Sequence, residues 1–150
     1  MAVLCRLGAS DFATGEQLNA QTIGNRHYHH VYPDALLKEA GIPSFLALNC
    51  ALIKDKTNLT IGRKDPLAYL KDRYEWTSEA IVQERLQSHL IPIPELANGG
   101  YEGLAEDEKT AKLKQDFDAF LQRRGELVMA AVKKLAEGRQ LSPAELYSEV

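Results

Sequence analysis

The second half of the chain carries hydrophobic residues at helical spacing. Ser78 is placed to cap one helix, and Pro92 and Pro94 are placed to end it. The apolar positions of this helix are Ile81, Val82, Leu86 and Leu90. After a connector rich in glycine and acidic residues, the pattern predicts a long helix from about Glu108 to Glu137. Its predicted apolar stripe, which would face a core or a partner, consists of Leu113, Phe117, Leu121, Val128, Val132 and Leu135.

The first half opens with a short strand-like run and a helix signal. Histidine, tyrosine and valine alternate from Arg26 to Tyr32, which predicts a strand. Pro33 should end this strand because proline cannot continue a hydrogen-bonded ladder. Asp34 is placed to cap a helix over the ALLKEAG segment, and Gly41 is a stop signal for it.

A second strand and a further helix are predicted before residue 75. The apolar run CALIK at 50–54 has the length of a strand, and the turn-like KDKTN segment overlaps its end. Asp65 is placed as the cap of the next helix, with Pro66 at the first helical position. Together with the long helices of the second half, this order predicts a fold that is α+β and mostly α.

Composition limits the chain to one compact domain. A chain of 150 residues, 45% of them apolar, can bury one proper core. Cys5 and Cys50 form no CxxC pair, which argues against a disulfide framework and favours a reducing, cytoplasmic setting. No apolar run approaches the roughly 20 residues that a membrane span needs, and the first residues lack the features of a signal peptide. We therefore expect a soluble, cytoplasmic protein with no membrane partner.

The charge divides along the chain. The net charge is -3, but residues 1–74 hold nine basic and seven acidic side chains, whereas residues 75–150 hold nine basic and fourteen acidic ones. Within 54–73, six basic residues stand against three acidic ones. This distribution favours a phosphate-facing first half, although a solvated helix face would show the same pattern.

Side chains suited to phosphodiester chemistry gather in the HYHHVYP segment at 27–33 and at two later asparagines. Histidine accepts a proton near neutral pH, so we assign His30 as the general base that deprotonates water. His29 and the amide oxygen of Asn58 would ligate a divalent metal. Asn49, whose amide both donates and accepts, would bond the backbone of the intervening loop and hold His30 in orientation. The residues expected to contact the phosphates of nucleic acid are Arg26, Lys54, Lys56, Arg63 and Lys64.

These residues resemble a known family, the HNH or His-Me finger nucleases. The segments DFATGEQL, HHVYP, NCALIKDKTN, IGRKDPLAYL and SHLIP resemble the C-terminal nuclease domain of GmrSD-type modification-dependent restriction endonucleases, from about residue 11 to residue 92. The nine-residue gap between the asparagines is also similar to that in the HNH domain of RNA-guided DNA nucleases. The residue pattern predicts a lead-in segment at 1–24 and a helical extension at 75–150 that packs on the core. The resemblance implies that residues 25–74 form a ββα-metal core. It also implies cleavage of phage or modified DNA.

Two departures from the family pattern change the expectation. Many relatives carry Asp or Glu where this chain has His29, and an imidazole ligand should shift the metal preference from Mg²⁺ toward Mn²⁺, Ni²⁺, Co²⁺ or Zn²⁺. The family's nucleotide-hydrolysing sensor domain carries a DGQQR-like motif, and neither this motif nor a P-loop occurs here. We therefore expect either a C-terminal domain separated from its sensor domain or a stand-alone effector that depends on a partner subunit. Double-strand cleavage would need a homodimer or two encounters.

A second function class stays open from the sequence. In it, the domain binds DNA or a partner protein without catalysis, and the histidine cluster holds a structural metal ion. Tyr28, Tyr32 and Trp76 are expected in the core or at its rim, and His89 is expected to cap or pack. Cys50 is expected to be a small buried residue and not a nucleophile.

Overall fold

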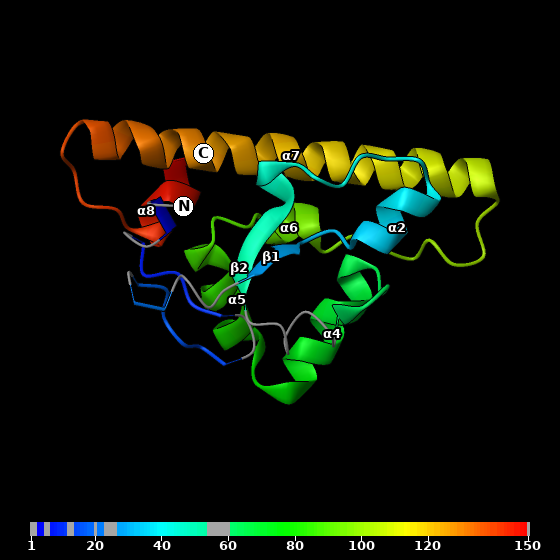
Figure 1. Cartoon of the computed structure of the whole chain (residues 1–150), viewed down its shortest axis with the longest axis horizontal. Helices are drawn as coiled ribbons and strands as arrows, with labels where there is room; N and C mark the ends of the chain where they lie inside the picture. The colour runs from blue at the N-terminus through cyan, green and yellow to red at the C-terminus, as the bar shows by residue number, and fades with distance from the viewer. Residues whose placement is uncertain are drawn as a thin grey trace.

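The computed structural model describes residues 3–4, 7–11, 14–19, 21–22, 27–53 and 61–149, with only the backbone described at His27. The fold is mostly helical with one small two-stranded antiparallel sheet, which confirms the expected class, α+β and mostly α. Figure 1 shows the long helix α7 running along the whole length of the molecule above the sheet, with α4 and α5 on the opposite side.

The sheet pairs β1, His27–His30, with β2, Cys50–Ile53. The register places His30 opposite Cys50 and Tyr28 opposite Leu52. The strand predicted to reach Tyr32 ends two residues earlier, at His30, because residues 31 and 32 bend away. Its predicted first residue, Arg26, lies outside the described residues.

The connection between the strands holds the helix α2, Asp34–Glu39, and the 3-10 helix η2, Ala47–Asn49. The expected cap at Asp34 is wrong, since Asp34 is the first helical residue and no side chain caps α2. Pro33 occupies the N-cap position instead, so the helix begins one residue earlier than a capping Asp34 would allow. Gly41 ends the helix as predicted, with a φ of 66° that strains any residue with a Cβ.

Helices α4, Pro66–Trp76, and α5, Glu79–Ser88, begin at the predicted caps. The Asp65 carboxylate accepts from the Ala68 N–H at 2.8 Å, and Ser78 Oγ accepts from the Ile81 N–H at 3.3 Å. A short helix not predicted from the sequence, α6 at Ile93–Leu96, follows α5. The lead-in segment contacts the end of α5, where Ser10 N–H donates to Ser88 Oγ at 3.1 Å.

Helix α7 spans Glu106–Ala136, close to its predicted bounds, and the unpredicted helix α8 spans Pro143–Glu149. The predicted stripe on α7 is only partly right, because Leu121 and Val128 pack against the core while only partly buried and Val132 is exposed. The buried residues of α7 are Leu113, Phe117, Phe120, Arg124, Leu127, Ala131 and Lys134. Two of these buried residues, Arg124 and Lys134, are charged. A prediction from hydrophobicity alone therefore chose apolar residues next to them on the helix surface. Lys134 is ion-paired with Glu149 of α8 at 2.6 Å.

The core lies between α7 and the connection that follows β1. The ring of Tyr32 packs 5.2 Å from the rings of Phe117 and of Phe120, measured between centroids. Its hydroxyl donates to the Glu95 carbonyl oxygen of α6 at 3.2 Å. Burial of these rings stabilises the packing of α7 against the segment that follows β1. Within the part of the chain described, no helix is long and apolar enough to cross a membrane.

Candidate active site

The two adjacent histidines of β1 lie on opposite faces of the hairpin. Side chains alternate along a strand, so His29 shares one face with Ala51 and His30 shares the other with Cys50. His29 is 5% exposed and Ala51 is fully buried, whereas His30 is partly exposed. A substrate that meets both imidazoles must therefore sit at the end of the strand, where residues 31 and 32 turn the chain.

Asn49, the last residue of η2, holds this turn from the position just before β2. Its side chain is fully buried. The amide oxygen accepts from the Tyr32 N–H at 2.8 Å, and the amide nitrogen donates to the carbonyl oxygens of Tyr32 and Ser44 at 3.1 Å each. The Asn49 carbonyl oxygen also accepts from the Val31 N–H at 2.7 Å. The prediction that the Asn49 amide bonds the backbone of the intervening loop is confirmed, and both ends of that loop are held beside His30.

Helix α4 is attached to the same strand end. The Tyr69 hydroxyl donates to the Val31 carbonyl oxygen at 2.9 Å. Burial raises the pKa of Tyr69 well above its usual value, so the phenol stays protonated and remains a donor at any physiological pH. The chain thus presents two strands and a helix that meet at the residue after His30.

Asp34 and Ser44 form a polar cluster near His30 that the sequence did not reveal. The Ser44 hydroxyl donates to one Asp34 carboxylate oxygen, and Lys38 forms an ion pair with the other at 2.7 Å. These hydrogen bonds hold the pKa of the Asp34 carboxyl below its usual value, with a smaller contribution from the nearby His30. The sequence predicts a helix cap at Asp34 because aspartate before an apolar periodic run is typical of that position.

Phe45 contacts the His30 ring directly. The ring centroids lie 4.9 Å apart, and the ring planes meet at 84°. No feature of a lone phenylalanine in the sequence distinguishes such a position from an ordinary core position.

Two of the predicted phosphate contacts, Arg63 and Lys64, lie just before α4 and are ion-paired. Arg63 pairs with Glu39, and Lys64 pairs with Asp72. Arg63 and Lys64 line a cavity of about 300 Å³ together with Glu39 and Lys109. Exposed pairs of this kind contribute little free energy, roughly 0–1 kcal/mol, so their cations can exchange partners.

The other predicted site residues, Arg26, Lys54, Lys56 and Asn58, lie outside the described residues. Among the residues that are described, no group of three or more His, Cys, Asp and Glu side chains is placed to hold a metal ion. The structure therefore places one of the two predicted metal ligands, His29, and leaves the position of Asn58 as a prediction.

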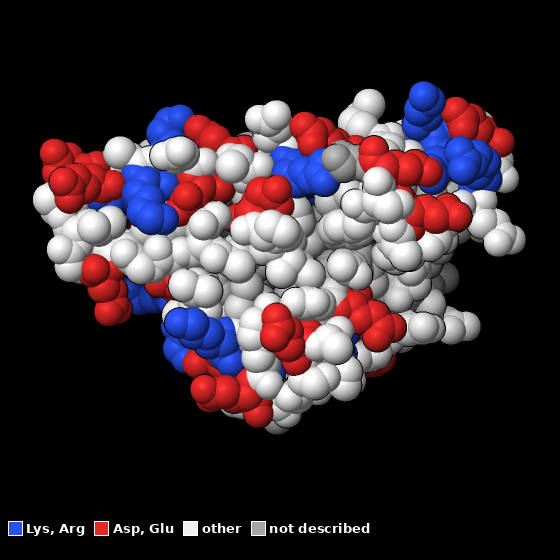
Figure 2. Space-filling model, turned by 180° about the vertical axis from the view of Figure 1, so that it is seen from behind, with Lys and Arg blue, Asp and Glu red and all other residues white. Residues whose placement is uncertain are grey.

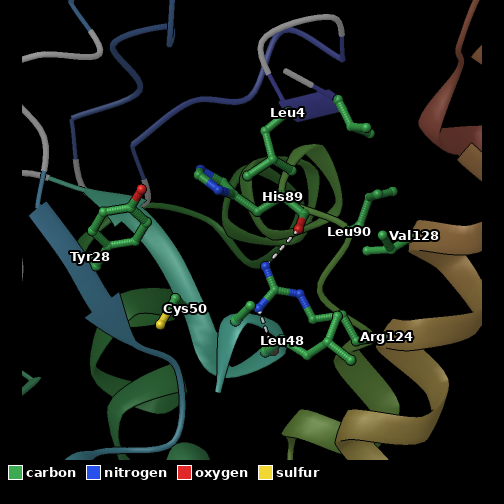
Figure 3. Close-up of a pocket in the computed structure, with 10 residues that line it drawn as sticks. Leu4, Tyr28, Leu48, Cys50, His89, Leu90, Arg124 and Val128 are labelled. Atoms are coloured by element: carbon green, nitrogen blue, oxygen red, sulfur yellow. Dashed lines mark hydrogen bonds between the residues drawn. The ribbon is translucent and has the colours of Figure 1, made fainter. Parts of the chain in front are cut away.

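A largely apolar cavity of about 340 Å³ opens beside the hairpin and has Arg124 of α7 in its wall (Figure 3). The Arg124 guanidinium donates to the Leu48 carbonyl oxygen at 2.7 Å and to the His89 carbonyl oxygen at 3.0 Å. Burial lowers the pKa of Arg124 to about 10, which leaves it charged at neutral pH. The cation thereby ties α7 and the end of α5 to η2, the turn that carries Asn49.

Cys50 lines the same cavity and is partly exposed, so the expectation that it is buried is wrong. It stands opposite the last residue of β1, at the open end of the hairpin. Desolvation raises the pKa of its thiol, which keeps the sulfur protonated and a poor nucleophile, in agreement with the prediction from the sequence. His89, expected to cap or pack, is fully buried, and its Nε2 lies 2.9 Å from the Ser10 carbonyl oxygen.

The face seen from behind carries charges of both signs. Figure 2 shows Lys and Arg side chains interleaved with Asp and Glu along the edge that α7 forms. On α7, side chains one helical turn apart form ion pairs, such as Lys114 with Asp118 at 2.8 Å. Interleaving of this kind is typical of a solvated helix surface.

Comparisons with known proteins give a partial likeness. The chain is similar to the uncharacterized protein MJ0686 of Methanocaldococcus jannaschii, with 28% identity over 121 residues, covering 71% of this chain and 20% of the relative. The chain therefore spans about one fifth of the length of the curated relative that it matches. No protein-family model matches the chain. No solved structure matches it either.

Proposed function

We propose that this chain is a metal-dependent HNH-type endonuclease that hydrolyses phosphodiester bonds in DNA. The observation that carries the proposal is the set of hydrogen bonds from the Asn49 side chain to the backbone of Tyr32 and Ser44, which we call the Asn49 clamp. It holds the connection between the strands beside the partly exposed His30. The order of strand, strand and helix around this point supports a ββα-metal core. On this proposal, residues 25–74 are the catalytic core and residues 75–150 are its helical support.

His30 is the general base in this proposal. Its imidazole stands at the open end of β1, where it can accept a proton from a water molecule aimed at phosphorus. Asn49 does not touch the substrate but fixes the backbone on which His30 stands. Tyr69 fixes the same turn from α4.

His29 and Asn58 are the proposed ligands of the divalent ion. Imidazole nitrogen and carboxamide oxygen fit Mn²⁺, Co²⁺, Ni²⁺ and Zn²⁺, and His29 faces the buried side of the hairpin, where water competes little for its ring. Such an ion, when bound, supplies positive charge that stabilises the phosphorane and the leaving oxygen. Asn58 lies in the segment that joins β2 to α4, outside the described residues.

Five basic residues of the 25–74 segment are the proposed phosphate contacts. Arg63 and Lys64 would exchange their exposed carboxylate partners for phosphate oxygens, a change that costs little because surface pairs are weak. Arg26, Lys54 and Lys56 belong to the same proposed surface. Phosphate contacts carry affinity without sequence information, so this surface would bind DNA of any sequence.

A biological role follows from the resemblance to restriction effectors. We propose that the chain cuts phage or modified DNA in the cytoplasm, under the control of a nucleotide-hydrolysing sensor domain or partner subunit. Because one site cuts one strand at a time, a double-strand break needs a homodimer or a second encounter. The match covers one fifth of a longer relative, which is compatible with a role as one domain or subunit of a larger assembly.

The test is a nicking assay on supercoiled plasmid with Mn²⁺. Wild-type protein should produce open circles, and His30→Ala should slow the reaction about 100-fold or more, because a general base contributes typically 10²–10⁴-fold. Cys50→Ala is the matched control, since Cys50 lies opposite His30 in the register, and it should keep its activity within about 2-fold of the wild type.

Two outcomes would contradict the proposal. Activity that survives His30→Ala in a protein of unchanged circular dichroism removes His30 from the mechanism. A wild-type chain that leaves plasmid intact with every metal favours the alternative, a catalytically silent binding module with a structural metal site.

The metal preference is a separate prediction. With an imidazole in place of a carboxylate ligand, Mn²⁺, Co²⁺, Ni²⁺ or Zn²⁺ should support nicking at least as well as Mg²⁺. Rates would be measured at equal free-ion concentration after treatment with EDTA. Activity with Mg²⁺ alone would contradict the assignment of His29 as a ligand.

A further inference from the structure

Phe45 is held in an exposed position beside the candidate base. It exposes 77% of its side chain in the loop between α2 and η2, although burial of a phenyl ring is favourable. Its ring nevertheless makes a defined contact, edge to face, with the His30 imidazole at 4.9 Å.

The backbone that presents Phe45 is anchored on both sides. The neighbouring Ser44 is buried, and its carbonyl oxygen accepts from the Asn49 amide at 3.1 Å and from the Leu46 N–H at 2.9 Å. The Ser44 hydroxyl bonds Asp34. The clamp that positions His30 therefore also positions Phe45, so the two rings are presented as one unit.

Positive charge lies next to this ring. Lys38 Nζ stands 5.6 Å from the Phe45 ring centroid. Lys38 lies over the ring and is ion-paired with Asp34 at 2.7 Å, a partly exposed pair whose cation can exchange partners. An exposed ring with such a cation beside it can bind a single nucleotide, because the base stacks on the ring and the cation attracts the phosphate.

We propose that Phe45 stacks on a nucleobase next to the scissile phosphate, so that the preferred substrate is single-stranded or locally unpaired DNA. In an intact duplex both faces of each base are covered by neighbouring bases, and a side chain beside the backbone cannot reach them. A base that has left the stack exposes its aromatic face, and this holds for every base whatever the sequence. This inference rests on the proposed function and adds a substrate class to it.

The test compares binding of one sequence as a single strand, as a duplex and as a duplex with a central unpaired bubble. Fluorescence anisotropy would be measured in EDTA, so that no strand is cut. Phe45→Leu keeps an apolar side chain but removes the aromatic face. It should weaken single-strand and bubble binding about 10-fold, within the range measured for base–aromatic stacking, and change duplex binding by less than about 2-fold.

Two variants serve as controls. Phe45→Trp should retain the preference for unpaired DNA because it restores a stacking face. Trp76→Leu removes an aromatic ring that is 66% exposed at the end of α4, and it should alter none of the three affinities. A 2-aminopurine placed at the unpaired position should be quenched by the wild type and less so by Phe45→Leu.

Cleavage rates separate this inference from its alternatives. If Phe45 only holds the His30 ring in position, Phe45→Leu would slow the cleavage of single strands and of duplex equally. That result would overturn the stacking role. Unchanged binding and cleavage of every substrate would also overturn it while leaving the nuclease proposal standing. A wild-type chain that neither binds nor cuts any nucleic acid would refute both.

Discussion

Replacing Asn49 with alanine should destabilise the chain more than most single substitutions. The change removes three buried hydrogen bonds, to the Tyr32 N–H, the Tyr32 carbonyl and the Ser44 carbonyl. At about 0.5–1.5 kcal/mol net for each bond, the loss is about 1.5–4.5 kcal/mol. The backbone groups left without partners add to this, so we expect about 3–5 kcal/mol in the free energy of unfolding. That is a large share of the roughly 5–15 kcal/mol by which a domain is stable.

The assay is unfolding in urea, monitored by circular dichroism, with Asn19→Ala as the matched control. Asn19 also bonds the backbone, accepting from Gln21 N–H at 2.9 Å and Thr22 N–H at 3.0 Å, but in an exposed turn where water replaces the lost bonds. The control should lose less than about 1 kcal/mol. With a slope of about 2 kcal/mol per molar urea, Asn49→Ala should move the midpoint by about 2 M.

The reasoning about Asn49 has two ways to fail. A stability loss no larger than that of Asn19→Ala would show that the three bonds do not hold the loop. A large stability loss with unchanged nicking per folded molecule would show that the loop does not position His30. Asn49→Asp provides a further check, because its carboxylate would face two carbonyl oxygens and destabilise the fold at neutral pH.

Two further perturbations test the surroundings of the site. Arg124→Met keeps the apolar stem but removes two charge-assisted hydrogen bonds to backbone carbonyl oxygens. It should lower the free energy of unfolding, measured by urea titration, by about 2–4 kcal/mol. A loss smaller than that caused by the same substitution at an exposed arginine would contradict the anchoring role. The pKa of Asp34 is lowered by hydrogen bonds from Lys38 and Ser44, so its stabilising contribution is present above the unfolded value of about 3.9 and is lost as the pH falls through the folded pKa. Asp34→Asn should flatten this acid limb in urea midpoints taken from pH 6 to pH 2, and an unchanged limb would show that the carboxylate is not stabilised in the fold.

Local signals in the sequence located most helices. The caps at Asp65 and Ser78 and the stop at Gly41 depend on a few adjacent residues, and all three were predicted correctly. The bounds of α7 were predicted within two residues because a long periodic run dominates any local exception. The short helices α6 and α8 were missed, since each is too brief to show a period.

Tertiary contacts explain what the sequence did not show. Arg124 lies in the buried line of α7 because two backbone carbonyls receive it, and such partners cannot be recognised from the chain alone. Asp34 pairs with Lys38 and accepts a hydrogen bond from Ser44 instead of capping the helix, and these partners also cannot be recognised from the chain alone. The bonds of Asn49 to the loop backbone were predictable because a carboxamide can both donate and accept hydrogen bonds. Phe45 was not, because its sequence neighbourhood is that of an ordinary core residue.

The location of a bound metal tests the central claim most directly. Crystals of the chain grown with Mn²⁺ and measured near the manganese absorption edge would place the ion by anomalous scattering. The account predicts a peak within coordinating distance of a His29 ring nitrogen and the Asn58 amide oxygen, at the end of β1 on which His30 stands. A peak bound elsewhere, or none at these side chains at saturating Mn²⁺, would contradict it.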